Sequence, residues 1–296
     1  MSQLFKQVVL IGVGLIGGSL ILDLKRQHLI GAVHGIDLDA DNLQRALERK
    51  VVDTASTVID DIVAQADLVI LATPVGTIAG ITQALQPYLQ AACVIIDVGS
   101  TKQTTIQAIE KHLPEHYPHF VATHPIAGSD RHGAMAAQFR LFENKKLILC
   151  PHGQQNADSY QRVWRLWQAT GAVVSELSPS EHDAILAMVS HLPHLIAYSY
   201  MHAIANQDLG AQALHYAGSG FRDFTRIAAS HPAIWTDVSF ANQDSLLQLI
   251  DAQQQELQRL KDLILAGDAQ ALYAYYDQAQ QQRDAWPPQQ TPSSKQ

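Results

Sequence analysis

Short apolar runs separated by amphipathic stretches fill the chain from residue 7 to about residue 178, and they constrain the fold more than any other feature. The runs read VVLIGV, AVHGID, LVILATP, CVIIDVG, HFVATHP, LILCP and AVVSEL. Apolar runs of this length between helical patterns are typical of buried strands in a mostly parallel sheet. The sequence therefore predicts an α/β domain with a doubly wound sheet over residues 1–178.

The pattern changes at LSPSEHDAIL, where Ser178, Pro179 and Glu181 match a capping box with proline at the first helical position. A long helix should begin there. Later stretches such as SLLQLIDAQQQELQRLKDLILAG keep helical spacing, and Gly267 with Asp268 should separate the last two helices. We therefore predict an all-helical C-terminal domain over residues 179–285 and a disordered tail over residues 286–296.

A glycine-rich turn follows the first predicted strand in VVLIGVGLIGGSL. It places Gly12, Gly14 and Gly17 in the G-x-G-x-x-G pattern at the start of a helix. The three glycines allow a tight turn, close approach of the backbone to a pyrophosphate, and close packing of the helix. The helix N-terminus supplies N–H groups to the phosphates. These residues predict a Rossmann-type dinucleotide site.

Asp37 ends the second apolar run, twenty residues after Gly17, where a carboxylate can bind both ribose hydroxyls of NAD. No arginine is adjacent to receive the 2′-phosphate of NADP, so NAD is the favoured cofactor. The alternative is that Asp37 only caps the next helix. The predicted cofactor-binding residues are Gly12, Gly14, Leu15, Ile16, Gly17, Asp37, Thr73 and Pro74.

Charge and hydropathy limit the partners. The chain of 296 residues has a formal net charge of -8, with acidic residues spread along it, which argues against a nucleic-acid surface. The apolar segment 184–205 is interrupted by three histidines and Pro193, which favours a buried helix or a dimer interface over a membrane span. The N-terminus lacks a secretory cleavage pattern, so we expect a cytoplasmic protein.

Polar side chains follow several predicted strands, at the sheet edge where ligands gather. His124 precedes Pro125, which restricts the backbone of His124 to extended conformations. A histidine beside a hydride acceptor can take the hydroxyl proton during oxidation, and Ser100 could orient its ring. His124 could equally be a hydrogen-bonded core histidine. Lys102 could serve the sheet edge or be a solvated residue in the first turn of a helix.

The helical half offers two further clusters. His191 and His194 lie one turn apart, but no acidic or cysteine ligand accompanies them at suitable spacing, so no metal site is predicted. Arg222 and Arg226 also lie one turn apart, in an apolar context. Buried or half-buried arginines need anions, which could be an internal carboxylate such as Asp223 or the carboxylate of a substrate.

Six segments in order resemble the prephenate dehydrogenase family, with its arogenate and cyclohexadienyl variants, over most of residues 7–240. They are GVGLIGGSL, DLVILATPV, DVGSTK, THPIAGSDRHGA, SHLPH and GFRDFTRIA. The resemblance implies an NAD-binding domain joined to a helical domain that forms a homodimer. It also implies oxidative decarboxylation of prephenate to 4-hydroxyphenylpyruvate, or of arogenate to tyrosine.

The resemblance also implies roles for individual residues. His124 matches the histidine that takes the proton from the ring hydroxyl, and Ser100 matches the serine that orients this histidine. Arg226 matches the arginine that holds a substrate carboxylate, and His194 matches a substrate-site histidine. The remaining pocket positions are Arg222, Ser129, Asp130 and Trp235. Arg222 and Asp130 stand where some relatives carry lysine and glutamate, which leaves the substrate preference open.

Two other functions remain compatible with the motifs. One is a β-hydroxyacid type of dehydrogenase that uses Lys102 as its acid/base. The other is a non-catalytic protein that binds the dinucleotide and reports it to a partner. The sequence contains no Y-x-x-x-K, which argues against a short-chain dehydrogenase.

Overall fold

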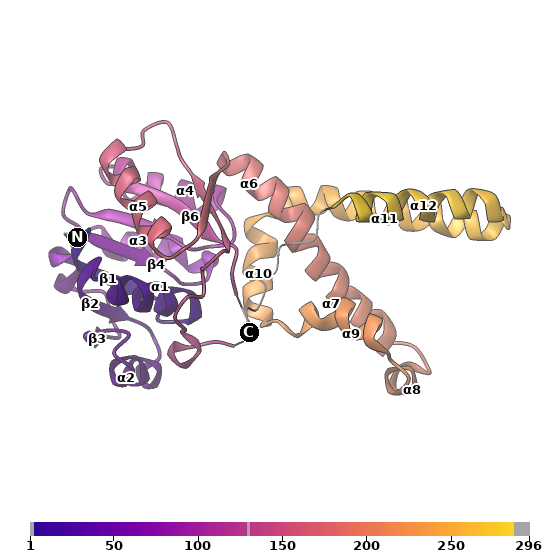
Figure 1. Cartoon of the computed structure of the whole chain (residues 1–296), viewed down its shortest axis with the longest axis horizontal. Helices are drawn as coiled ribbons and strands as arrows, with labels where there is room; N and C mark the ends of the chain where they lie inside the picture. Colours follow the sequence, from indigo (N-terminus) through magenta and orange to yellow (C-terminus); the bar gives the residue numbers. More distant parts are fainter. Residues whose placement is uncertain (1–2, 129–130, 287–296) are drawn as a thin grey trace, which may run out of the picture. The chain divides into compact units, whose positions relative to one another are not determined.

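The computed structural model describes residues 3–128 and 131–286. Contacts divide the chain into two units, the first ending at Leu246 and the second beginning at Leu247. The first unit holds the sheet, the helices that cover it and the helical segments that follow the sheet (Figure 1). The boundary predicted at residue 178 lies inside this first unit, so it stays a prediction.

An eight-stranded sheet with the order β3-β2-β1-β4-β5-β6-β7-β8 forms the first part of the chain. All neighbouring strands are parallel except β6 and β7. The predicted Rossmann-type, doubly wound sheet is confirmed, with one additional short edge strand, β3. The strands are β1 Phe5–Ile11, β2 Ile30–Ile36, β3 Thr54–Ser56, β4 Leu68–Leu71, β5 Val94–Asp97, β6 Phe120–Pro125, β7 Lys146–Cys150 and β8 Val173–Glu176.

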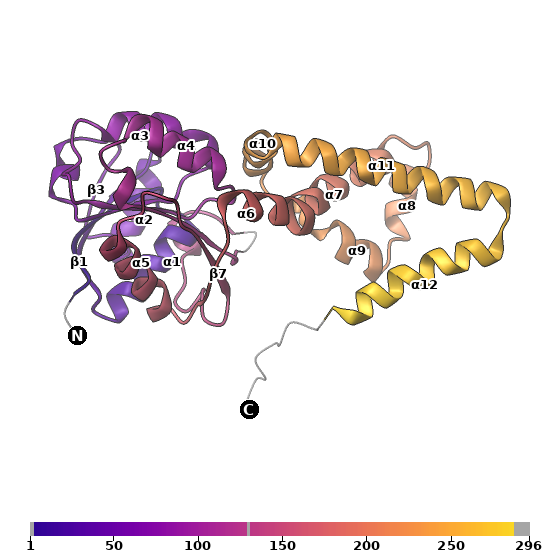
Figure 2. The same ribbon diagram turned by 90° about the horizontal axis from the view of Figure 1, so that it is seen from above.

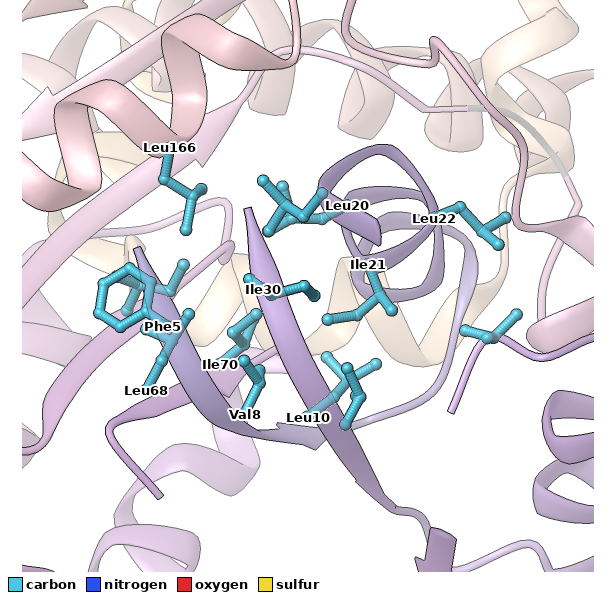
Figure 3. Close-up of a cluster of buried hydrophobic side chains, with 14 of the residues drawn as sticks. Phe5, Val8, Leu10, Leu20, Ile21, Leu22, Ile30, Leu68, Ile70 and Leu166 are labelled. Atoms are coloured by element: carbon cyan, nitrogen blue, oxygen red, sulfur yellow. The ribbon is translucent and has the colours of Figure 1, made fainter. Parts of the chain in front are cut away.

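Alternate residues of each strand pack on opposite faces of the sheet. Val8 and Leu10 of β1 join the core beneath α1 and α5, which Figure 3 shows in close-up. Val9 and Ile11 join the second core, beneath α3 and α4. Figure 2 shows the two pairs of helices on opposite sides of the sheet. The helices of the sheet-containing part are α1 Leu15–Arg26, α2 Ala40–Glu48, α3 Ile78–Leu85, α4 Gln103–His112 and α5 Ala157–Ala169.

Beyond β8, the described residues contain helices and no strand. As predicted, the Ser178 hydroxyl accepts from the Glu181 N–H, and the Glu181 carboxylate accepts from the Ser178 N–H. The helix that starts there continues through one wide π-helical turn. The segments are α6 Pro179–Leu186, the π turn Ala187–His191, α7 Leu192–Ala205, α8 Gly210–His215, α9 Ser219–Thr225, the 3-10 turn Arg226–Ala229, α10 Pro232–Ala241 and α11 Gln243–Ala266.

The second unit contains the part of α11 from Leu247 onward and the whole of α12, Ala269–Ala285. Gly267 separates the two helices with a φ of +64°, and the Asp268 side chain caps α12, as the sequence predicts. A left-handed residue after a helix is the usual place for glycine because a side chain is strained there. Residues 287–296 of the predicted tail lie outside the described residues.

The continuous helical run Pro179–Ala205 is long and apolar enough to cross a membrane by length and composition alone. Only 28% of its most apolar 18-residue window is buried within the chain. Met188 and Val189, for example, are 51% and 68% exposed. The expectation of a helix buried within its own chain is therefore wrong for most of this segment, whereas an apolar face on the surface is what a dimer interface requires.

Candidate active site

The glycine-rich turn has the geometry that a dinucleotide requires. Gly12 has a φ of +88°, and a Cβ built on it would lie 2.5 Å from the carbonyl oxygen of Ala72. A Cβ on Gly17 would lie 2.7 Å from Leu10 Cδ1, so this glycine lets α1 pack on the sheet. A Cβ on Gly14 would meet nothing within 4 Å. The open space therefore lies at the second glycine, where a pyrophosphate approaches the backbone.

The start of α1 can also receive an anion, because Gly14 occupies the N-cap position and no side chain of the described residues caps this end. Leu15 and Ile16 form the first turn of the helix. Thr73 and Pro74 follow β4 at the same edge of the sheet, Thr73 half-buried and Pro74 exposed. These predicted cofactor-binding residues thus lie around the carboxyl ends of β1 and β4.

Asp37 directly follows β2 and is half-buried. Its Oδ2 accepts from the Val13 N–H at 2.9 Å and from the Asn42 amide at 3.2 Å, which fixes the carboxylate beside the glycine turn. The residue that caps α2 is Asp39, which accepts from two backbone N–H groups. The alternative role of Asp37 as the cap of this helix is therefore wrong.

Lys102 lies at the N-terminus of α4 and is fully buried, with 0% of its surface exposed. Its ammonium donates to Asp97 Oδ2 and, at 2.9 Å, to the carbonyl oxygen of Thr123. Asp97 ends β5 and also accepts from the N–H groups of Gly99 and Thr123. The ion pair therefore joins the ends of β5 and β6, and the expectation that Lys102 is solvated is wrong.

His124 lies near the end of β6, and 8% of its surface is exposed. Its Nδ1 lies 2.8 Å from Nε2 of His182, and the two rings meet edge to face. Burial, together with the positive charge that His182, Lys102 and His191 can carry, holds the pKa of His124 well below 6.5. The ring is therefore neutral near pH 7 and can accept a proton.

Ser100 follows β5 at the same edge and is half-buried. Its side chain makes no hydrogen bond to His124 among the described residues, so the structure does not support the prediction that Ser100 orients the ring. The ring is oriented instead by the hydrogen bond between its Nδ1 and Nε2 of His182. Thr101, the next residue, is fully buried and faces Thr104 of the following helix.

The helical segments bring together three of the predicted substrate residues. The rings of His194 and Trp235 stack with centroids 3.6 Å apart. His194 Nδ1 donates to the Ser190 carbonyl at 2.8 Å, which leaves Nε2 as an acceptor in the neutral ring. Burial lowers the pKa of His194, and the nearby guanidinium of Arg226 lowers it further. His194, Trp235 and Arg226 therefore form one group.

Arg222 and Arg226 are both exposed, which corrects the expectation of buried or half-buried arginines. Neither forms an ion pair with a carboxylate in the described parts of the chain, Asp223 included. A carboxylate within the described residues therefore does not explain the pair. Ser129 and Asp130, the remaining predicted pocket residues, lie outside the described residues.

Four buried polar residues link these groups: His182, Asp183, His191 and Asn242. Sequence analysis singled out only His191 and missed the other three. The Asn242 amide donates to the Asp183 carbonyl at 2.8 Å and lies 3.2 Å from His191 Nδ1. His191 ends the π turn, and its Nε2 has no hydrogen-bond partner among the residues that the structure describes. One signal was available, because His182 and Asp183 share a helix face with Leu186 and Ala187.

Comparisons with known proteins identify the family of this chain. Residues 20–176 match the family model described as "Prephenate dehydrogenase, nucleotide-binding domain", and residues 178–278 match "Prephenate dehydrogenase, dimerization domain". The chain belongs to the prephenate dehydrogenase family. The first match begins after the glycine turn, so the geometry of that turn is independent support for a dinucleotide site. The two models also meet beside the predicted boundary at residue 178.

Known members of this family are similar to the chain over nearly its full length. The chain is 35% identical to prephenate dehydrogenase of Bacillus subtilis, covering 97% of this chain and 78% of the relative. It is 31% identical to cyclohexadienyl dehydrogenase of Zymomonas mobilis, covering 94% and 95%. The crystal structure of Aquifex aeolicus prephenate dehydrogenase with hydroxyphenyl propionate and NAD+ superposes with a TM-score of 0.87 at 31% identity, covering 95% of this chain and 98% of the other.

Proposed function

We propose that this chain is an NAD-dependent dehydrogenase that oxidatively decarboxylates prephenate to 4-hydroxyphenylpyruvate in tyrosine biosynthesis. The observation that carries the proposal is His124, a neutral, oriented imidazole at the ligand-binding edge of a dinucleotide-binding sheet. Because the chain belongs to the prephenate dehydrogenase family, we take prephenate as the substrate whose proton His124 accepts.

The glycine turn and Asp37 fit NAD. Open space at Gly14 and the uncapped start of α1 suit the pyrophosphate, and Asp37 suits the ribose hydroxyls. Asp39, rather than a cationic side chain, stands two residues after Asp37, which favours NAD over NADP. When bound, NAD accepts the hydride from the ring carbon that bears the hydroxyl.

His124 accepts the proton of that hydroxyl and later returns it. Its Nε2 accepts the proton as the hydride leaves the same carbon, and the ring carboxylate departs as carbon dioxide. The electron pair of the broken carbon–carbon bond completes the aromatic ring. His124 then returns the proton to the oxygen, which becomes the phenol of the product, so the histidine ends in its starting state.

Arg226 binds a substrate carboxylate in this proposal. Its guanidinium is exposed, pairs with no carboxylate within residues 3–128 and 131–286, and lies close enough to His194 to lower the pKa of that ring. Arginine binds carboxylates through two parallel hydrogen bonds, which suits a dicarboxylate such as prephenate. His194 and Trp235 form one wall of the substrate site, while Arg222, Ser100, Ser129 and Asp130 stay predicted site residues.

The two other functions fit the contacts less well. Lys102 is buried and paired with Asp97, so it cannot reach a substrate as an acid/base without breaking the ion pair. A non-catalytic sensor needs no neutral, oriented imidazole beside the nicotinamide. Both alternatives therefore leave the arrangement around His124 unexplained.

We also propose that the protein works as a homodimer in the cytoplasm, without a membrane or nucleic-acid partner. Residues 178–278 match the family's dimerization domain, and the exposed apolar side chains of Pro179–Ala205 suit burial against a second copy. Histidines within this run, such as the buried His182 and His191, are costly in lipid.

The decisive test is NADH formation by the purified protein with NAD and prephenate, with arogenate and NADP as alternative reactants. We expect turnover of prephenate and preference for NAD. His124→Asn should lower kcat by roughly two to four decades while leaving the Kd of NAD within about twofold. His116→Asn is a matched control, because His116 is a buried histidine whose ring bonds the Gln90 carbonyl, away from His124. Turnover of the His124 variant within a few-fold of wild type would remove His124 from the mechanism.

A further inference from the structure

His182 and Asp183 are consecutive residues in the first turns of α6, and both have 0% of their surface exposed. Helix starts are usually solvated, and a carboxylate is buried at a cost unless hydrogen bonds and charges compensate. Neither residue contributes to the apolar packing of the sheet. Their burial therefore needs an explanation in terms of the groups that they contact.

Asp183 is held as a carboxylate by three donors. Oδ1 accepts from the Lys102 N–H at 2.8 Å, and Oδ2 accepts from the Gln103 N–H at 2.9 Å, both at the start of α4. Oδ1 also lies 2.8 Å from His182 Nδ1. Burial alone raises the pKa of Asp183, but the hydrogen bonds from His182, Gln103 and Lys102 outweigh it and lower the pKa below 3.8. An ionised carboxylate can only accept hydrogen bonds.

This carboxylate determines where the protons lie on two rings. Because Asp183 only accepts, Nδ1 of His182 carries a hydrogen. Burial lowers the pKa of His182, so its ring is neutral and Nε2 carries a lone pair. That lone pair lies 2.8 Å from Nδ1 of His124, which must then carry a hydrogen. His124 is left with its lone pair on Nε2, the nitrogen that would face the hydroxyl of a substrate.

We propose that His182 and Asp183 are positioning residues that hold His124 in the tautomer that accepts a proton at Nε2. The same chain of hydrogen bonds directs the charge of Asp183 towards the imidazolium that forms during the reaction. A buried acid that fixes the tautomer of a catalytic histidine is known from serine proteases, where the acid contacts the histidine directly. Here His182 stands between the two. The effect on catalysis rests on the proposed function, whereas the tautomer of His124 follows from the hydrogen bonds alone.

The first measurement is nitrogen NMR of the protein labelled with 15N-histidine, with NAD bound and no substrate, at neutral pH. The His124 signals are assigned by their loss in His124→Asn. We expect a protonated Nδ1 and an Nε2 with a lone pair. The opposite assignment in the wild-type protein would overturn the proposal, whether or not any variant folds and whether or not prephenate is turned over.

Variants then test the consequence in catalysis. His182→Leu removes the acceptor, so the His124 signals should shift towards a mixture of tautomers, and kcat should fall by roughly 10- to 1,000-fold with the Kd of NAD unchanged. His182→Gln places a carbonyl oxygen near the position of Nε2 and should recover much of the loss. His116→Gln is the control for replacing a buried histidine.

The outcomes separate the two proposals. Wild-type kcat in folded His182→Leu overturns the positioning role, and so does His182→Gln that is no better than His182→Leu. If His182→Leu does not fold, the 15N spectrum of the wild-type protein and the kcat of His182→Gln relative to wild type test the positioning role. Failure of the wild-type protein to oxidise prephenate would overturn the proposed function, while the tautomer of His124 would still be measured.

Discussion

Replacing Lys102 with methionine separates the structural role of this lysine from a catalytic one. Methionine fills a similar volume but leaves the Asp97 carboxylate, which is 1% exposed, without its ammonium partner. Removing one member of a buried ion pair costs about 3–5 kcal/mol. Asp97 keeps its hydrogen bonds from the N–H groups of Gly99 and Thr123, at 2.9 and 3.1 Å, so the lower end of this range applies.

A loss of about 3 kcal/mol corresponds to a fall in Tm of about 5 °C for a protein of this size. Thermal unfolding followed by circular dichroism measures this shift. The double variant Asp97→Asn/Lys102→Met should recover part of the loss, because the unpaired charge is gone. Below its Tm, Lys102→Met should keep turnover within about tenfold of wild type, since Lys102 does not contact the reacting groups in our proposal. A Tm within about 2 °C of wild type, together with abolished turnover, would refute this reasoning and favour Lys102 as an acid/base.

Three further predictions follow from the site. Arg226→Ala should raise the KM of prephenate by roughly 10- to 100-fold with little change in kcat, because a charge-assisted carboxylate contact is lost, and an unchanged KM would contradict that assignment. The acid limb of kcat/KM should have its midpoint below pH 6.5, because burial and nearby positive charge lower the pKa of His124. The neutral base is present above that pKa and is lost as the pH falls through it, so a midpoint above pH 6.5 counts against His124 as the base. Gly17→Ala should lower Tm by several degrees, because its Cβ would lie 2.7 Å from Leu10 Cδ1, whereas Gly14→Ala should leave Tm nearly unchanged. Both glycine variants should weaken NAD binding in calorimetry, and unaffected binding by Gly14→Ala would place the pyrophosphate elsewhere.

Local sequence signals predicted most of the fold. Buried strands between amphipathic helices produce long apolar runs, and the capping box at Ser178 and the turn at Gly267 depend only on neighbouring residues. The strand β3 was missed because it has only three residues, none of them buried. An edge strand this short leaves no hydrophobic pattern to read.

The site was harder to predict because the decisive contacts join distant parts of the chain. His124 and Arg226 were found through their motifs. His182 and Asp183 look like ordinary residues at a solvated helix start, and only the packing of α6 against the start of α4 buries them. For Lys102 the sequence left open a role at the sheet edge and a solvated position in the first turn of a helix, and only its burial beside Asp97 decides between them.

The contact between α6 and α4 has a consequence for how this enzyme can be recombined. The two family models meet between residues 176 and 178, which makes that point look like a natural junction for chimeras. Asp183 nevertheless bonds the backbone of Lys102 and Gln103, and His182 bonds His124. A chimera joined at residue 177 would combine the proposed proton acceptor, His124, of one parent with the supporting residues of the other. A junction placed after the π turn, beyond His191, would transfer His124 together with its hydrogen-bonded partners.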